Sequence, residues 1–219
     1  MNKNLRLFIG CLLLTGLAAA YTAKVFPQLP DQIPVHFNAA GTPDRYEAKG
    51  SGAWLMVYVM AGMSAMFAVL PFLSPKTKSI ESFRKTYDIL IAGIMLFMLG
   101  MHVVTLNASS TGKLSPLGFG LLMCALFGFL GNMLGKVTPN YYVGIRTPWT
   151  LESPENWERT HRFAARLSVG ASILGAIIIL IGGPLLIAMS IVVLSLIVPV
   201  GYSYLLYTQA SKSSDSPST

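Results

Sequence analysis

Apolar residues occur along this chain in long, uninterrupted blocks. Six blocks of 17 to 23 residues contain no Asp, Glu, Lys or Arg, and charged or turn-forming segments separate them. A helix crosses the hydrocarbon core of a bilayer with about 20 residues, and lipid offers no hydrogen-bond partner to a backbone that is not helical. We therefore predict six membrane-spanning helices: Leu7–Ala23, Ala53–Leu73, Ile89–Leu106, Leu117–Leu134, Leu167–Gly183 and Leu185–Tyr207.

The composition supports a membrane protein. Of the 219 residues, 53% are hydrophobic and only 11% are charged, whereas a soluble domain carries about 25% charged residues. Soluble, disordered and disulfide-rich secreted proteins are thereby excluded as first interpretations, and Cys11 and Cys124 both lie inside predicted helices. The predicted fold class is all-α, a bundle of six transmembrane helices. The Ser-rich tail Gln209–Thr219 is expected to be disordered.

The positive charges predict the orientation. With the amino terminus inside, twelve of the 16 Lys and Arg residues lie on cytoplasmic segments and four on outer segments. Both termini are then cytoplasmic, and the first helix is expected to be retained rather than cleaved as a signal peptide. The net charge of +7 follows from this topology and from contact with anionic lipid, so direct binding of nucleic acid is not expected.

Two connections are long enough to carry a function. Residues 1–73 comprise the first two helices and an outer loop, and residues 74–219 form a four-helix region with a long cytoplasmic connection. We expect these to be the two domains. Small residues spaced four apart, at Gly131 and Gly135 and at Ala171 and Gly175, predict close packing of helices within one molecule.

The outer loop predicts a short extended stretch. Apolar and polar residues alternate over residues 33–38, and Gly41 permits a turn. Potential metal ligands in the loop are Asp31, His36, Asp44 and Glu47. They lack the close paired spacing of a metal site, so no metal is predicted. We expect instead hydrogen bonds and ion pairs of the loop's acids with its bases, Asp44 or Glu47 with Arg45 or Lys49.

The cytoplasmic connection predicts a capped helix that continues into the fifth span. Ser153 is a favourable N-cap and Pro154 a favourable first residue. Acid-first pairs four residues apart are Glu155–Arg159 and Glu158–Arg162. At about 100° per residue, one face of this helix is expected to pack inward, with Trp157, His161, Ala164 and Ser168. The opposite face carries Arg159, Arg162 and Arg166.

Arg146 is the sharpest single candidate in this connection. It follows Gly144, which permits a turn, and precedes Thr147-Pro148, which favours an extended backbone. Its guanidinium could pair with Glu152 or Glu158, bind a lipid phosphate, or hold a carboxylate of a partner protein. An ion pair with one of the two glutamates is the interpretation we favour.

No catalytic motif is present, and the spans lack ionisable carboxylates, so neither an enzyme nor an ion-coupled transporter is favoured. No cofactor is predicted. One alternative is a membrane-embedded enzyme or carrier for a lipid or small molecule, with His161, Glu158 and Arg146 around a polar cavity. A second alternative is a purely structural membrane subunit.

Two motifs resemble the SdpI family of bacterial integral membrane immunity proteins. The outer loop, with Leu29-Pro30, Ile33-Pro34-Val35-His36-Phe37-Asn38, Gly41 and Asp44, resembles the family's amino-terminal domain of unknown function. The connection resembles the carboxy-terminal signature, with Asn140-Tyr141, Gly144-Ile145-Arg146-Thr147-Pro148-Trp149-Thr150-Leu151, Trp157 and Thr160-His161. Both lie in the family's order, and the flanking spans extend the resemblance over nearly the whole chain.

The resemblance implies a six-span immunity protein of the bacterial cytoplasmic membrane that protects a cell from a secreted antimicrobial or toxic peptide. It also implies signalling, in which a soluble transcriptional repressor is held at the membrane. We therefore expect the outer loop to bind a ligand or partner through His36, Phe37, Asn38, Gly41 and Asp44. The corresponding residues of the cytoplasmic connection are Asn140, Gly144, Arg146, Thr147, Trp157, Glu158 and His161.

Overall fold

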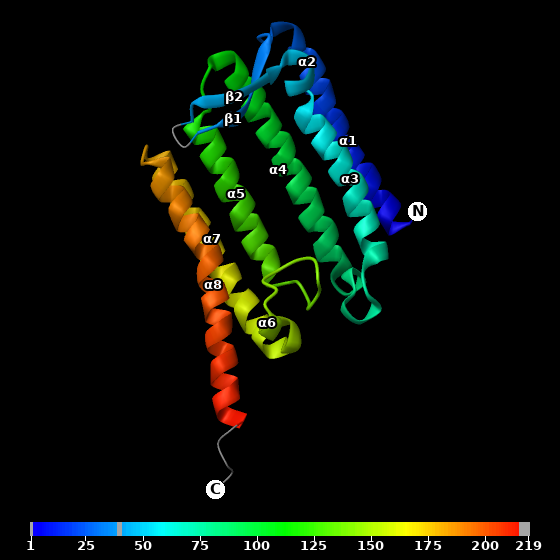
Figure 1. Cartoon of the computed structure of the whole chain (residues 1–219), viewed down its shortest axis with the longest axis vertical. Coiled ribbons are helices and arrows are strands. Elements are labelled where there is room, and N and C mark those ends of the chain that lie inside the picture. Colours follow the sequence, from blue (N-terminus) through cyan, green and yellow to red (C-terminus); the bar gives the residue numbers. More distant parts are fainter. Residues whose placement is uncertain (1, 39–40, 215–219) are drawn as a thin grey trace. The chain divides into compact units, whose positions relative to one another are not determined.

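A computed structural model describes residues 2–38 and 41–214 (Figure 1). Within these residues, six helices are long and apolar enough to cross a membrane, which confirms the predicted all-α membrane fold. These helices are α1 (Lys3–Val25), α3 (Leu55–Leu73), α4 (Arg84–Thr111), α5 (Pro116–Leu134), α7 (Pro154–Leu180) and α8 (Leu185–Ser214). The shorter elements are strands β1 (Gln32–Phe37) and β2 (Pro43–Ala48), helices α2 (Lys49–Gly52) and α6 (Pro148–Glu152), and 3-10 turns at Phe26–Gln28, Lys76–Lys78 and Ile80–Phe83.

Helices extend beyond the charge-free blocks. α4 begins at Arg84, five residues before the predicted span, because a helix continues into polar sequence once its apolar part lies in lipid. The expectation of a disordered tail from Gln209 is wrong as far as Ser214, because α8 continues to that residue. Residues 215–219 of that tail lie outside the described part of the chain.

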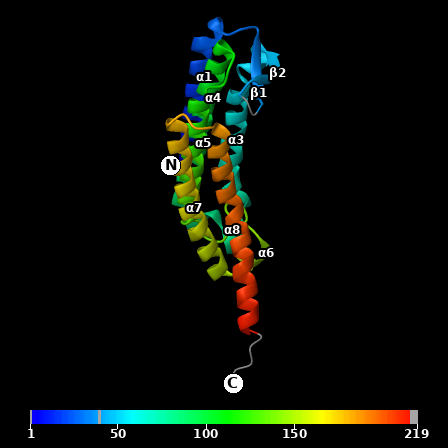
Figure 2. The same cartoon turned by 90° about the vertical axis from the view of Figure 1, so that its left-hand side faces the viewer.

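The chain forms two compact units, Met1–Leu73 with Asp88–Leu126, and Ser74–Tyr87 with Phe127–Thr219. In the first unit, α1 and α3 lie side by side (Figures 1 and 2). Thr15 of α1 lies 3.4 Å from Ser64 of α3, hydroxyl to hydroxyl, and the Thr22 hydroxyl lies 2.7 Å from Nε2 of His102 in α4. All four side chains are buried, so these bonds satisfy polar groups that would otherwise be costly inside apolar helices.

The outer loop is an antiparallel hairpin, which includes the predicted extended stretch. β1 pairs with β2 from Gln32 opposite Ala48 to Phe37 opposite Pro43, with irregular register on both sides of His36. Ile33 anchors β1, because it is only 2% exposed and packs in a cluster with Leu29, Ala53 and Leu106. The other strand, β2, is exposed over most of its length.

In the second unit, α7 and α8 pack against each other, and the end of α5 packs against α7. A Cβ atom on Gly131 would lie 2.6 Å from the Cβ of Ser168, and one on Gly128 would lie 3.1 Å from that of Ser172. Only glycine allows backbones to approach so closely. The predicted packing of small residues within one molecule is therefore confirmed for this part of α5.

Candidate functional site

The connection between α5 and α7 is organised by Asn140, which is completely buried. Its side-chain oxygen accepts hydrogen bonds from the backbone N–H groups of Tyr142 and Val143, both at 2.7 Å. Its side-chain nitrogen donates to the carbonyl oxygens of Thr138 at 2.8 Å and Val143 at 3.0 Å. The amide thus makes four hydrogen bonds to backbone groups, so this predicted site residue defines the path of the loop.

His161 joins the same loop to α7. The ring is 1% exposed, and its Nε2 accepts a hydrogen bond from the Ile145 N–H at 2.9 Å. Because Nε2 is an acceptor, the proton is on Nδ1, which donates to the Trp157 carbonyl oxygen at 2.8 Å. The imidazole stacks on Trp157 with the ring centres 4.0 Å apart, and the indole N–H donates to the Val137 carbonyl oxygen at 2.7 Å. Both nitrogens of the neutral ring are therefore engaged within the fold.

Gly144 is required by this packing. Its backbone φ is +116°, a value that residues other than glycine rarely adopt. A Cβ at this position would overlap the His161 ring and would lie 3.2 Å from the far edge of the Trp157 indole. The loop can approach the stacked rings this closely only because residue 144 has no side chain.

The Thr147 side chain starts the short helix α6. Its hydroxyl accepts from the Thr150 N–H at 3.3 Å, and the Thr150 hydroxyl accepts from the Thr147 N–H at 2.9 Å. This reciprocal arrangement is a capping box formed by two threonines. α6 places Trp149 on α8, where the indole N–H donates to the Ser203 hydroxyl at 2.8 Å and the ring stacks on Tyr207.

The start of α7 confirms the sequence predictions. Ser153 caps the helix by accepting from the Asn156 N–H at 3.1 Å, and Pro154 is its first residue. The four residues of the predicted inward face are buried, and Arg159, Arg162 and Arg166 on the opposite face are exposed. The predicted ion pairs form as well, Glu155 with Arg159 at 3.3 Å and Glu158 with Arg162 at 2.5 Å.

The predicted ion pair of Arg146 with Glu152 or Glu158 is wrong. Its exposed guanidinium donates to the backbone carbonyl oxygen of Tyr141. Among residues 2–38 and 41–214, no ion pair joins it to Glu152 or Glu158. The loop turns back on itself at Gly144, which brings a carbonyl oxygen within reach before either glutamate. Sequence spacing alone does not show this turn.

His161, Glu158 and Arg146 do not converge on a polar cavity, as the enzyme or carrier alternative requires. His161 is buried against Trp157, whereas Glu158 is exposed and paired with Arg162. Arg146 is exposed and bonded within its own loop. The three side chains therefore have separate surroundings and separate partners.

In the hairpin, His36 and Asp44 pair across the two strands, with Nδ1 and Oδ1 2.5 Å apart. This finding corrects the expected pairing of Asp44 with Arg45 or Lys49. The backbone of His36 is opposite Arg45, and the irregular register next to this pair leaves the neighbouring Asp44 carboxylate within reach of the imidazole. The Lys49 ammonium instead donates to the Leu29 carbonyl oxygen at 2.7 Å. Nowhere in the described chain do three or more His, Cys, Asp or Glu side chains gather as metal ligands.

The hairpin turn contains two further predicted residues. The backbone N–H of Asn38 donates a hydrogen bond to the Thr42 carbonyl oxygen, and the Asn38 carbonyl oxygen accepts one from the Gly41 N–H. The Asn38 side-chain oxygen also accepts a hydrogen bond from the Thr42 N–H at 3.1 Å. Gly41 has a φ of +73°, as expected for a glycine in a turn. Phe37 is half-buried, whereas His36 and Asn38 are exposed. The structure thus brings the five predicted hairpin residues into one small region.

Sequence reasoning missed the segment of residues 74–83, which packs on the connection. The Lys78 ammonium donates to the Leu151 carbonyl oxygen at 2.6 Å and lies 5.0 Å from the centre of the Tyr141 ring. Ser82 and Thr138 are 2.6 Å apart, hydroxyl to hydroxyl. No local pattern signals these contacts, because they join residues more than 50 positions apart in the chain.

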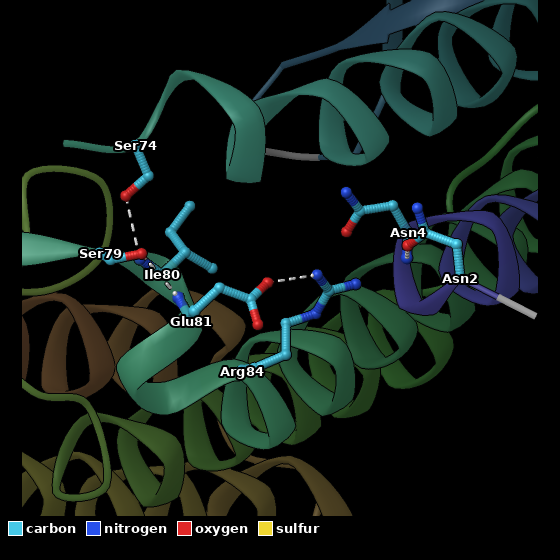
Figure 3. Close-up of polar contacts among 7 residues, drawn as sticks. All are labelled: Asn2, Asn4, Ser74, Ser79, Ile80, Glu81 and Arg84. Carbon is cyan, nitrogen blue, oxygen red and sulfur yellow. Dashed lines mark hydrogen bonds and ion pairs between the residues drawn. The ribbon is translucent and has the colours of Figure 1, made fainter. Parts of the chain in front are cut away.

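The same segment is held internally by short polar contacts (Figure 3). The Ser74 hydroxyl accepts from the Ile80 N–H at 2.9 Å, and the Ser79 hydroxyl accepts from the Glu81 N–H at 3.2 Å. Glu81 pairs with Arg84 at 2.9 Å, one turn later. Residues 74–84 therefore present Lys78 and Ser82 to the connection from an ordered backbone.

Comparison with known proteins supports the resemblance at both motifs. Residues 136–203 match the SdpI/YfhL protein family, and residues 13–61 match the Domain of unknown function (DUF1648). The chain is 24% identical over 216 residues to the Immunity protein SdpI of Bacillus subtilis (strain 168), which covers 97% of this chain and all of that protein. No solved structure matches the chain. The resemblance of this multi-pass membrane protein to the SdpI family, with the amino-terminal domain of unknown function, is thereby confirmed.

Proposed function

We propose that this chain is an immunity-type protein of the bacterial cytoplasmic membrane that gives resistance to a secreted antimicrobial or toxic peptide. The observation that carries the proposal is the similarity to Immunity protein SdpI over 97% of the chain. That similarity spans both the hairpin and most of the connection, the two regions with the most elaborate polar structure outside the spans. A protein related only through its apolar helices would not match in both regions.

We propose that the hairpin meets the peptide on the outer side of the membrane. Two features support this role. Ile33 of β1 packs in a hydrophobic cluster with Leu29, Ala53 and Leu106, which holds the hairpin in a fixed position. β2 is exposed, and the described chain has no third strand in this sheet, so an extended peptide can add to an edge through backbone hydrogen bonds. The side chains proposed to select the peptide are His36, Phe37, Asn38, Gly41 and Asp44.

We propose that the connection has a supporting role and a docking role on the cytoplasmic side. Asn140, Gly144, Thr147, Trp157 and His161 hold the loop and α7 in one arrangement. Arg146 and Glu158 are exposed beside them and are available to a soluble transcriptional repressor. A repressor held here would link the presence of peptide outside to gene expression inside.

The test of immunity is survival. The full chain is expressed in a sensitive bacterium, which is then challenged with secreted toxic peptides from related bacteria. We expect growth at peptide concentrations that kill the same strain carrying an empty vector. Substitution of the hairpin pair, His36→Ala with Asp44→Ala, should abolish protection without lowering the amount of protein in the membrane. The matched control is Lys113→Ala, which changes an exposed residue of a different loop.

Two outcomes would count against this function. Unchanged sensitivity with the wild-type chain across the peptide panel would contradict immunity itself. Protection that survives the hairpin substitutions, or an equal loss with Lys113→Ala, would contradict the hairpin as the recognition site. Repressor docking is tested separately, by the membrane localisation of fluorescently tagged regulators encoded beside this gene, with wild type compared with Arg146→Ala.

A further inference from the structure

Two basic residues, Lys136 just after α5 and Arg166 within α7, have no acidic partner in the described parts of the chain. Lys136 and Arg166 are both exposed, and in the described parts of the chain neither forms an ion pair or a hydrogen bond through its side chain. The other two arginines of this α7 face are compensated, Arg159 by Glu155 and Arg162 by Glu158. Among the three arginines of this α7 face, Arg166 is thus the one without an acidic partner in the described chain.

The packing of α5 on α7 brings Lys136 and Arg166 together. A Cβ on Gly135 would lie 3.6 Å from the Cβ of Ala165, so the residues that follow each of these also start close together. The glycine contacts run in opposite directions along the two helices, which makes the pair antiparallel. Arg166 follows Ala165 within α7, and Lys136 follows Gly135 in the turn directly after α5. The backbones of Lys136 and Arg166 therefore lie near one another where the end of α5 meets α7.

Their positions along the helices correspond to the edge of the hydrocarbon core. α5 ends at Leu134, two residues before Lys136, and the uncharged sequence of α7 begins at Leu167, directly after Arg166. Basic side chains at such a boundary reach the level of the lipid phosphates. A guanidinium binds two phosphate oxygens in a fork, and an ammonium adds a compact point charge.

We propose that Lys136 and Arg166 form a binding site for the phosphate of an anionic membrane lipid. The lipid's acyl chains lie along the exposed apolar surface of α7, which includes Ile173, Leu174 and Ile177. The headgroup then supplies the negative charge that Glu155 and Glu158 supply to the neighbouring arginines. This site is independent of the proposed immunity function, because it involves neither the hairpin nor a peptide.

Native mass spectrometry of the purified full-length chain tests the site, with phosphatidylglycerol as the probe and phosphatidylcholine as the neutral comparison. Each basic residue near a membrane surface contributes roughly fivefold to the binding of anionic lipid. Lys136→Gln and Arg166→Gln should therefore each weaken phosphatidylglycerol binding roughly fivefold, and the double variant roughly 25-fold. Binding of phosphatidylcholine should not change, and millimolar inorganic phosphate should not displace the bound lipid.

The matched control is Arg159→Gln, which removes the same charge about 10 Å away along the helix. It should leave phosphatidylglycerol binding within twofold of wild type. An equal loss with Arg159→Gln would show a general charge effect and overturn the site, as would full binding by the double variant. Displacement by inorganic phosphate would overturn the assignment to a lipid. Arg166→Lys, which keeps the charge and the fold, should bind more tightly than Arg166→Gln, and equal binding by the two would contradict a phosphate contact.

Discussion

The Nε2 atom of His161 accepts a hydrogen bond from the backbone N–H of Ile145 at 2.9 Å. One side chain of α7 thereby determines where the preceding loop lies. The bond requires a neutral ring with its proton on Nδ1, and the Trp157 carbonyl oxygen accepts that proton. The histidine of the motif thus stabilises the fold by holding the loop against α7.

Removal of this hydrogen bond should destabilise the protein. His161→Phe keeps an aromatic ring on Trp157 but leaves the half-buried Ile145 N–H without its acceptor, at a cost of about 1–3 kcal/mol. His161→Ala also loses the stacked ring and should cost about 3–5 kcal/mol. Unfolding of the purified variants by titration with sodium dodecyl sulfate measures both. Equal stability of the phenylalanine variant and the wild type would show that the hydrogen bond contributes nothing.

Substitution of Gly144 should be poorly tolerated. Gly144→Ala places a Cβ against His161 and forces a residue with a side chain into a positive φ, so we expect a loss of about 2 kcal/mol or more. Gly170→Ala is the control, because a Cβ there meets open space within a helix. That variant should be unchanged or more stable by up to about 1 kcal/mol. Thermal unfolding in detergent compares the two, and similar midpoints would contradict this role of Gly144.

The contact between α5 and α7 predicts a compensating pair of substitutions. Gly131→Ala would place its Cβ 2.6 Å from that of Ser168, and the helices must separate at a cost of about 1–3 kcal/mol. Ser168→Gly removes the opposing Cβ, so the double variant should regain part of the loss. A coupling energy of about 0.5–3 kcal/mol in a double-mutant cycle is expected. Strict additivity of the two single effects would contradict direct contact. Gly62→Ala, in open space on α3, serves as the control.

Release of the hairpin should follow from a single core substitution. Ile33→Ala removes most of a side chain that is 2% exposed and should cost about 2–5 kcal/mol. Limited proteolysis should then cleave between residues 32 and 48 faster than in the wild type. Tyr46→Ala, which alters a 49%-exposed side chain of β2, should leave stability within about 0.5 kcal/mol. Equal protection of both variants would show that Ile33 does not anchor the hairpin.

The orientation in the membrane is testable with single cysteines. The native Cys11 and Cys124 are buried, which keeps background labelling low. The positive charges predict that a cysteine at exposed Thr42 reacts with an impermeant maleimide in intact cells, and that one at exposed Glu155 reacts only after permeabilisation. The reverse pattern would invert the proposed topology. Labelling of both positions from outside would contradict six crossings.

Features that depend on residue patterns within one helix could be predicted from the sequence. The capped start of α7 at Ser153 and its inward face with Trp157 and His161 depend only on residue type and helical period, and both are confirmed. The uncharged blocks likewise located all six spans, because the hydrophobic thickness of a bilayer limits their length. These features are local, so the sequence contains them in full.

Contacts that depend on a chain reversal were not readable. Asp44 pairs with His36 because the hairpin register is irregular at that point, and register follows from tertiary packing. Arg146 bonds to a carbonyl oxygen of its own loop because Gly144 reverses the chain. Every residue offers a backbone carbonyl oxygen as an acceptor. A prediction that considers only oppositely charged residues therefore gave the wrong partner for Arg146.

The length of α8 has a consequence for anything attached to its end. Its 30 residues extend over about 45 Å, whereas the hydrocarbon layer is about 30 Å thick. The last turns of α8, which include the exposed Gln209 and Lys212, therefore extend beyond the hydrocarbon layer into water as a helix. A fluorescent protein fused directly after Ser214 would be held away from the lipid headgroups and would not disturb the bilayer surface.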